Sequence, residues 1–274
     1  MSADIPSVKF RASSVGNLLV GGNAITDKQL ARIHELQQRQ REGSKPLTAN
    51  MQEELSELIA KRDGEFEFGA TALKYIRDVW LKNTFEYEEP VVTNEMLKGL
   101  MCEEEAIGVL VRHVPGGFRI KNEESWSDDH FAGTPDIVLD DIVEDIKCSW
   151  SLRTFVETTK PDSMYRAQGQ VYMALTGASK FRLAHVLLDT PHEIVEEEKK
   201  RFYFRFNCDE ENKYYKDAVS KVMKMHTASR LIPEEHRVKT FEFDRDERFI
   251  DKLRERVELA RKVYASMTLG GENE

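Results

Sequence analysis

The segment from Gly133 to Lys147 constrains the fold of this chain more than any other, because it has the pattern of a charged β-hairpin. An apolar run of strand type is followed by a turn of two aspartates and by a second strand that ends in Lys147. Because side chains alternate along a strand, Asp145 and Lys147 share one face, and Asp136 opens the opposite strand within reach of them. Two carboxylates and an ammonium group at one sheet edge suit a hard divalent cation and an attacking water.

The composition predicts a soluble intracellular protein. The 274 residues are 40% hydrophobic, enough for one large domain or two small ones with a buried core. The sequence shows no apolar run of membrane-spanning length and no apolar N-terminal signal, so we expect a cytoplasmic protein without a membrane partner. Its cysteines, Cys102, Cys148 and Cys208, lack metal-type spacing, and their odd number argues against a disulfide framework. The net charge of −9 argues against a basic nucleic-acid coat protein but is compatible with an enzyme whose cleft is locally basic.

Residues 28–88 have the pattern of a helical block placed before the hairpin. Helices are expected at 28–42, from Thr48 or Asn50 onward, and at about 69–83, with a Gly-Ser-Lys-Pro loop between the first two. We interpret the block as a helical insertion or subdomain. Two roles are open for it: a packing appendage, or a substrate clamp or partner surface.

Two helices, one on either side of the hairpin, each place a polar residue on an apolar stripe. In the helix expected at about 95–112, Glu103 interrupts a stripe that begins at Leu100, and in the helix expected at 163–176, Gln168 does the same. A carboxylate on a core-facing stripe is costly unless it is paired, hydrogen-bonded or bound to a metal. Glu103 is therefore either a rim glutamate that reaches water or a group that faces the hairpin.

The remaining elements are expected to complete the core and its cover. Strands are predicted at 118–120, 181–188 and 201–206, and helices at 210–228 and 246–267. Gly169, in the interior of the helix that carries Gln168, indicates a close backbone approach. The seven histidines form no pair with zinc-ligand spacing, and no glycine-rich phosphate loop is found.

Four separated elements lie in the order of a known nuclease family. They are Glu103 before the sheet, Pro135-Asp136 opening the hairpin, Asp145-Ile146-Lys147 closing it, and Gln168 with Tyr172 on the next helix. Together they resemble the PD-(D/E)xK nuclease superfamily, and most closely its phage lambda exonuclease and YqaJ-type viral recombinase branch. Further stretches similar to that branch are Arg11–Asn17, Lys98-Gly99, Lys147-Cys148 followed by Arg153 and Phe155, and 167–170.

The resemblance implies an α/β (α+β) fold of the restriction-endonuclease type, with helices flanking a mixed central sheet. It makes 1–274 a single nuclease domain, with a helical insertion at 28–88, a catalytic core at 95–210 and a C-terminal helical cover at 211–274. The glutamate that is more usual in the third motif is replaced by Asp145, whose shorter side chain puts the metal geometry in question. Related branches that hold an iron–sulfur cluster use four cysteines, so the cysteine pattern argues against them.

The resemblance also implies roles for single residues. It implies Mg²⁺, with Mn²⁺ as a substitute, held by Glu103, Asp136, Asp145 and the carbonyl oxygen of Ile146. Lys147 would orient or deprotonate the attacking water, and Gln168 would keep the lysine, water or phosphate in register. The substrate-binding residues that it implies are Ser13 and Arg11 at a terminal 5′-phosphate, Arg153 and Arg166 at the DNA backbone, and Tyr172 beside Gln168. For each arginine a solvated surface residue is the alternative.

The function implied by the resemblance is that of a Mg²⁺-dependent DNA exonuclease. It would work 5′→3′ from duplex ends, as a homo-oligomer of the family's trimeric type, and supply single strands to an annealing protein in phage-type recombination in a bacterial host. One alternative keeps the fold but makes the enzyme a structure-specific or restriction-like endonuclease. Another is a non-catalytic DNA- or protein-binding module that works through 28–88.

Overall fold

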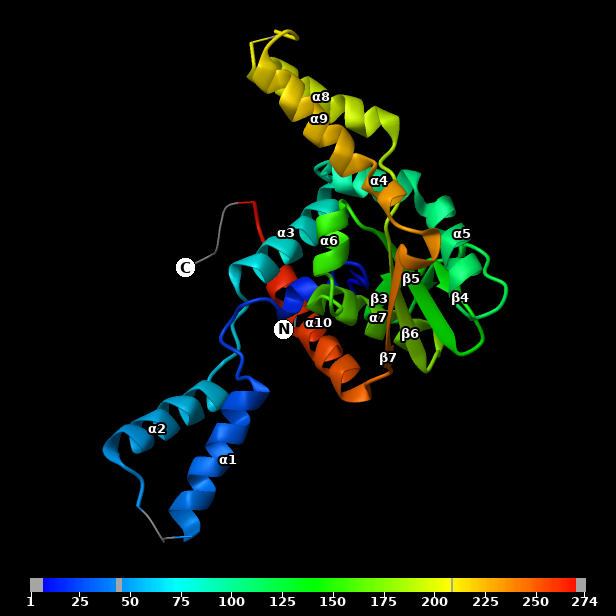
Figure 1. Ribbon diagram of the computed structural model, residues 1–274. Coiled ribbons are helices and arrows are strands. Elements are labelled where there is room, and N and C mark those ends of the chain that lie inside the picture. Colours follow the sequence, from blue (N-terminus) through cyan, green and yellow to red (C-terminus); the bar gives the residue numbers. More distant parts are fainter. Residues whose placement is uncertain (1–6, 43–45, 208, 270–274) are drawn as a thin grey trace. The chain divides into compact units, whose positions relative to one another are not determined.

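The computed structural model describes residues 7–42, 46–207 and 209–269, so Cys208 lies outside the described residues (Figure 1). The chain divides into two compact units. One consists of Asn17–Tyr87 together with the stretch that begins at Arg256, and the other of the segment ending at Gly16 together with Glu88–Glu255. The helical block predicted at 28–88 lies almost wholly in the first unit, and the predicted hairpin lies in the second.

The first unit is built from helices. They are α1 (Asp27–Glu42), α2 (Ala49–Asp63) and α3 (Ala70–Phe85). The Thr48 hydroxyl accepts a hydrogen bond from the backbone of Met51 and so caps α2, as its position before the helix predicts. α1 and α2 pack through a small apolar cluster of Ile33, Leu36, Leu47 and Leu55. Arg32 on α1 adds two hydrogen bonds, of 2.9 and 2.8 Å, to the Glu54 carboxylate on α2.

The second unit is organised around a mixed four-stranded sheet with the order β4-β5-β6-β7. Its strands are β4 (Ile137–Val138), β5 (Ile142–Cys148), β6 (Lys180–Val186) and β7 (Val238–Asp244). β5 and β6 are parallel, whereas β4 and β7 pair antiparallel with their neighbours. A smaller sheet has the order β1-β3-β2, with β1 at Phe10–Arg11, β2 at Trp126–Ser127 and β3 at Phe131–Gly133. The hairpin predicted from the sequence is thus present as β4 and β5.

The helices of the second unit flank the sheet and extend from it. They are α4 (Asn94–Met101), α5 (Glu103–His113), α6 (Leu152–Glu157), α7 (Ser163–Thr176), α8 (His192–Arg205) and α9 (Lys213–His226), with short 3₁₀ turns η2 (Ala228–Leu231) and η3 (Glu234–His236). A further 3₁₀ turn, η1 (Val15–Leu19), begins in this unit and ends in the other. α8 and α9 pack together as a helical hairpin (Figure 1). α10 (Glu247–Ser266) begins in this unit and ends in the other. Within the described ranges, no helix is long and apolar enough to cross a membrane.

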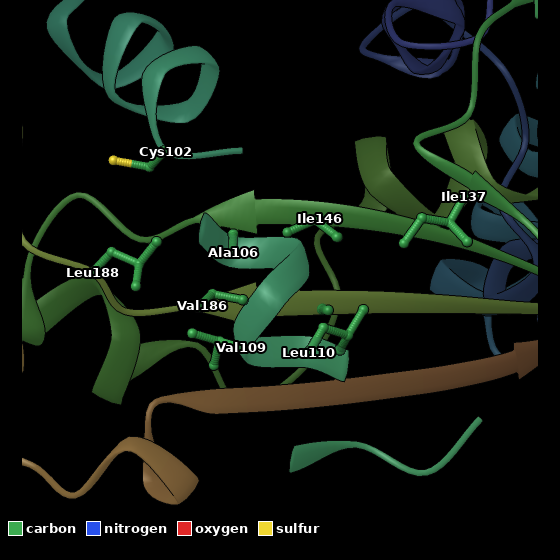
Figure 2. Close-up of a cluster of buried hydrophobic side chains, with 9 residues drawn as sticks. Cys102, Ala106, Val109, Leu110, Ile137, Ile146, Val186 and Leu188 are labelled. Carbon is green, nitrogen blue, oxygen red and sulfur yellow. The ribbon is translucent and has the colours of Figure 1, made fainter. Parts of the chain in front are cut away.

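Opposite faces of the sheet are covered by α5 and α7. Figure 2 shows Ala106, Val109 and Leu110 of α5 lying over Ile146 of β5 and Val186 of β6 in one apolar cluster. Because alternate residues of a strand face opposite sides, the neighbours of Ile146 in β5 face α7 instead. The sheet therefore buries apolar side chains against α5 and presents Asp145 and Lys147 of β5 to α7.

α7 approaches the sheet closely at Gly169. A methyl group at this position would lie 2.6 Å from the ring of Phe181 on β6, so a side chain there would collide with the strand. The sequence indicated a close approach at Gly169, and its partner is this ring. α7 begins where the Asp162 carboxylate accepts a hydrogen bond from Met164, and it ends at Gly177, whose φ of 83° is easily adopted only by glycine.

Lys98 on α4 fixes the ends of two strands. Its side chain is only 1% exposed, and its ammonium group donates hydrogen bonds to the carbonyl oxygens of Leu188, at 2.9 Å, and Trp150, at 3.2 Å. These carbonyls lie just beyond β6 and β5. A buried ammonium needs such partners to offset its lost hydration. Lys98 therefore holds α4 against the chain that leaves the sheet.

Some sequence-based assignments were wrong. Residues 201–205 of the strand predicted at 201–206 belong to α8, where the ion pair of Arg201 with Glu198 at 2.8 Å favours a helix over the strand preference of the aromatic residues. The single helix predicted at 95–112 is broken at Cys102, and no strand forms at 118–120. The segment 211–274, predicted as a helical cover, also supplies β7 to the central sheet.

The contact at Gly169 gives a first prediction. Gly169→Ala should destabilise the protein by about 1–2 kcal/mol, because overpacking against Phe181 outweighs the roughly 1 kcal/mol that alanine gains in a helix. The matched control is Gly99→Ala on α4, where the added methyl group meets nothing within 4 Å. That variant should be as stable as the parent or more so. Urea unfolding of the two variants measures the difference, and equal stabilities would contradict the close approach.

Candidate active site

Asp145 lies at the centre of the site that β5 presents to α7. It is only 1% exposed, and its Oδ1 accepts a hydrogen bond of 3.1 Å from Nε2 of Gln168. The Lys147 ammonium lies 2.7 Å from Oδ2 of Asp145, and its side chain is 28% exposed. The ammonium and the carboxylate attract each other as a close ion pair, which offsets part of the cost of burying Asp145. The two residues share a face, as period-two alternation predicts.

Asp136 reaches the same place from the other strand of the hairpin. Its Oδ2 accepts a 2.7 Å hydrogen bond from the backbone nitrogen of Ile146, between the two charged residues of β5. Burial and the neighbouring Asp145 charge raise the pKa of Asp136 to about 7, although Lys147 acts in the opposite direction. Burial also raises the pKa of Asp145. The fold thus holds two carboxylates close together in surroundings that oppose their joint ionisation.

Gln168 and Tyr172 form a hydrogen-bonded chain behind the carboxylates. Nε2 of Gln168 donates to the Tyr172 hydroxyl at 3.0 Å, and this hydroxyl donates to the Thr134 carbonyl at 3.2 Å. Tyr172 is 4% exposed, and burial together with the Asp145 charge raises its pKa to about 12. The Tyr172 hydroxyl is thus a neutral buried link between Gln168 and the segment that carries Asp136, and its contact with substrate stays a prediction.

Glu103 is the first residue of α5 and points toward the same end of the sheet. Its negative charge contributes to the raised pKa of both Asp136 and Asp145. Its Oε2 lies 2.7 Å from the ammonium of Lys121, and its side chain is 20% exposed. The apolar stripe used to single it out was wrong, because Leu100 is 71% exposed and precedes the break at Cys102. Glu103 is a paired glutamate near the rim of the site.

The donor set fits a hard divalent cation in part. Asp136 and Asp145 supply carboxylate oxygens, and a cation would relieve the repulsion between these two crowded carboxylates. No group of three or more His, Cys, Asp or Glu side chains in the described ranges is close enough to hold a metal. Glu103, paired with Lys121, does not complete such a group. The two aspartates are thus compatible with Mg²⁺, and a third ligand from Glu103 stays a prediction.

The N-terminal segment that carries Arg11 and Ser13 borders this site. The backbone nitrogen of Ala12 donates to Ala132 at 2.8 Å, so β1 runs beside β3, which leads directly into the segment of Asp136. Ser13 is exposed in the turn that follows β1, and Arg11 is exposed on the strand. The structure therefore brings the Ser13 turn next to the loop before Asp136, and its binding of a 5′-phosphate stays a prediction.

The two arginines proposed for the DNA backbone lie on exposed surfaces. Arg153 on α6 is 83% exposed and pairs with Glu157 at 3.1 Å. Arg166 lies in the first turn of α7, 3.8 Å from Asp246 and over the ring of Phe249. Together with Lys160, Arg166 lines a cavity of about 630 Å³ beside β7. These positions leave both the DNA-binding and the solvated interpretations open.

Two residues near the carboxylates were missed from the sequence. Lys121 pairs with Glu103, and its position in an acidic loop gave no signal. The ring of Tyr165 faces the Lys147 ammonium at 5.3 Å from the ring centre. Tyr165 precedes Gln168 by three residues, so it occupies the same face of α7, and this spacing could have identified it.

Solved exonucleases share this architecture. The phage-related exonuclease of Haemophilus somnus 129PT matches with a TM-score of 0.63 and 21% identity over 94% of this chain and 93% of that chain. The alkaline exonuclease of Laribacter hongkongensis matches with a TM-score of 0.54 and 14% identity over 94% of this chain and 88% of that chain. The chain has the fold of these exonucleases.

The likeness is one of fold. Neither a known family model nor a curated protein matches the sequence. The structural match confirms the predicted mixed α/β architecture and, at the level of fold, the resemblance to phage-type exonucleases. The roles of individual site residues rest on the geometry described above.

The crowding of the two aspartates predicts how stability depends on pH. The pKa of Asp136 is about 7 in the folded state and near 3.8 without these neighbours. A raised folded pKa means that stability is present at low pH and is lost as the pH rises through about 7. In the absence of divalent cations, Asp136→Asn should therefore be more stable than the parent at pH 8 by about 1–2 kcal/mol, a value reduced for partial exposure.

The measurement is thermal unfolding of parent and variant between pH 4 and pH 8 in the presence of a chelator. The stability difference should shrink toward zero as the pH falls to about 4. Asp140→Asn, at the exposed turn of the same hairpin, is the matched control and should show no such trend. An Asp136→Asn variant less stable than the parent at pH 8 would contradict the repulsion between the Asp136 and Asp145 carboxylates.

Proposed function

We propose that this chain is a metal-dependent DNA exonuclease. The observation that carries the proposal is the clustering of Asp136 and Lys147 around the buried Asp145, which Gln168 holds, on a fold shared with exonucleases. The carboxylates are the oxygen ligands that Mg²⁺ or Mn²⁺ prefers, and the ammonium is placed to act on a phosphate oxygen or a water. Glu103 and the carbonyl oxygen of Ile146 are the proposed additional ligands.

The residues of the chain would share the work of phosphodiester hydrolysis. A cation bound by Asp136 and Asp145 would polarise the scissile phosphate and lower the pKa of a bound water. Lys147, fixed by Asp145, would orient that water and offset the negative charge that develops on the phosphate. Gln168 keeps the Asp145 carboxylate in place, and Tyr172 ties Gln168 to the segment of Asp136. Holding the reacting groups in a fixed geometry supplies a large share of the rate acceleration in enzymes.

The finer proposal concerns substrate and context. We propose digestion of duplex ends in the 5′→3′ direction, with Ser13 and Arg11 gripping the terminal phosphate, in a homo-oligomer that supplies single strands to an annealing protein of phage-type recombination. The place of the Ser13 turn beside β3 supports the end-binding role. The Laribacter exonuclease is solved in complex with dAMP, a mononucleotide of the kind that stepwise digestion releases. A cytoplasmic, bacterial or prophage setting follows from this proposal.

Loss of the catalytic groups tests the activity. Lys147→Ala and Asp136→Asn should each lower the rate of linear duplex digestion with Mg²⁺ by at least about a hundredfold, the usual scale for a group that acts on the attacking water. Asp140→Asn removes an exposed carboxylate of the same hairpin and should leave the rate unchanged. Release of acid-soluble nucleotides measures all three variants. Undiminished digestion by both Lys147→Ala and Asp136→Asn would refute the proposed nuclease activity.

The choice of substrate separates end digestion from internal cleavage. We expect linear duplex to be consumed from its ends and covalently closed circles to be spared. Duplexes with 5′-phosphate, 5′-hydroxyl or blocked 5′ ends, followed over time, report polarity, and Ser13→Ala should remove the preference for the phosphate. Cleavage of closed circles would instead show an endonuclease of the same fold.

A further inference from the structure

We propose that Tyr165 is a positioning residue that holds the Lys147 ammonium at the catalytic carboxylates. The inference rests on the proposed nuclease function and adds a residue that the motifs of the sequence do not contain. Tyr165 would act through Lys147 and would not itself touch the substrate. Its aromatic face, and not its hydroxyl, is the part that matters.

The geometry at Lys147 carries this inference. The ammonium lies 2.7 Å from Oδ2 of Asp145 on one side and 5.3 Å from the centre of the Tyr165 ring on another. A cation within about 6 Å of a ring centre is attracted by the negative face of the ring. Asp145 anchors the ammonium at the end of a flexible four-carbon stem, and the ring adds a second contact from another direction. Asp145 and Tyr165 together define one position for Nζ.

The Tyr165 ring is itself held in place. It lies in the first turn of α7, which is capped by Asp162, and one turn before Gln168 on the same face of the helix. His185 on β6 stands opposite Lys147 in the strand register, and its ring packs edge-to-face against Tyr165 with 6.0 Å between ring centres. His185 in turn packs against Phe241 of β7. A row of rings from the sheet thus supports the surface on which the ammonium rests.

The charges around this row are consistent with the role. Burial and the nearby Lys147 and Lys239 charges lower the pKa of His185 to about 4. His185 is therefore neutral near pH 7 and adds no positive charge behind Tyr165. The neutral ring of His185 therefore packs against Tyr165 without opposing its attraction for the Lys147 ammonium.

Kinetics of three variants test the proposal. Tyr165→Phe keeps the ring and should hold kcat on linear duplex within about twofold, whereas Tyr165→Met fills similar space without an aromatic face and should lower kcat by about tenfold with KM unchanged. Tyr214→Met, on the exposed surface of α9, is the control and should change neither constant. A Tyr165→Met enzyme with parental kcat, or a Tyr165→Phe enzyme as slow as Tyr165→Met, would overturn the proposal.

A spectroscopic readout separates this proposal from the nuclease function itself. Protons of the Lys147 side chain next to Nζ lie over the ring and should show an upfield ring-current shift, assigned by its loss in Lys147→Ala. The shift should persist in Tyr165→Phe and disappear in Tyr165→Met, and it requires no turnover. If Lys147→Ala digests DNA normally while the shift behaves as expected, the proposed function fails and the contact stands. A shift that is absent from the parent, or unchanged in Tyr165→Met, would refute the contact whatever the activity.

Discussion

The ionisable Asp145, buried in the middle of the sheet, is the constraint on which the rest of the site depends. A carboxylate that is 1% exposed is costly unless its surroundings replace the water that it has lost. The protein does so with an ammonium from Lys147 and an amide hydrogen bond from Gln168. Each of these partners is then fixed by others, so that hydrogen bonds extend through Tyr172 to the carbonyl of Thr134. The need to satisfy one buried charge thereby organises α7 against β5 and against the segment that leads into β4.

The other face of the same strand carries a second buried charge. Glu144 is fully buried beside Asp145 but points toward the opposite side of the sheet, where it bonds to Arg119 at 2.6 and 3.0 Å and pairs with Arg182. Arg119 also donates to backbone carbonyls, such as that of Pro115, that follow α5. Removal of one partner from such a buried pair leaves an uncompensated charge and is strongly destabilising. β5 is thus fixed on both faces by charge pairs, and this rigidity suits the catalytic role proposed for Asp145 and Lys147.

The sequence predicted those parts of the fold that local patterns determine. Period-two alternation was sufficient to place Asp145 and Lys147 on one face of a strand, and helical periodicity was sufficient to predict α7. Prediction from the sequence failed where contacts between distant segments determine the secondary structure. The aromatic run at 201–205 resembles a strand but lies in α8, and β7 is a strand that pairs with β6. The place of Tyr165 over Lys147 depends on how α7 crosses the sheet, and that crossing is set by packing that no short motif encodes.

The two lysines of the site differ in how firmly they are paired. Lys147 contacts a carboxylate whose side chain is 2% exposed, whereas Lys121 and Glu103 pair with 42% and 20% of their side chains exposed. Exposed ion pairs contribute only about 0–1 kcal/mol, so a dication that already has two carboxylate ligands would readily displace Lys121 from Glu103. Lys147 would keep its place, because Asp145 has a second oxygen to offer and the Tyr165 ring holds the ammonium. One lysine would then be a fixed part of the catalytic site, and the other an ammonium released beside it when the third carboxylate turns to the metal.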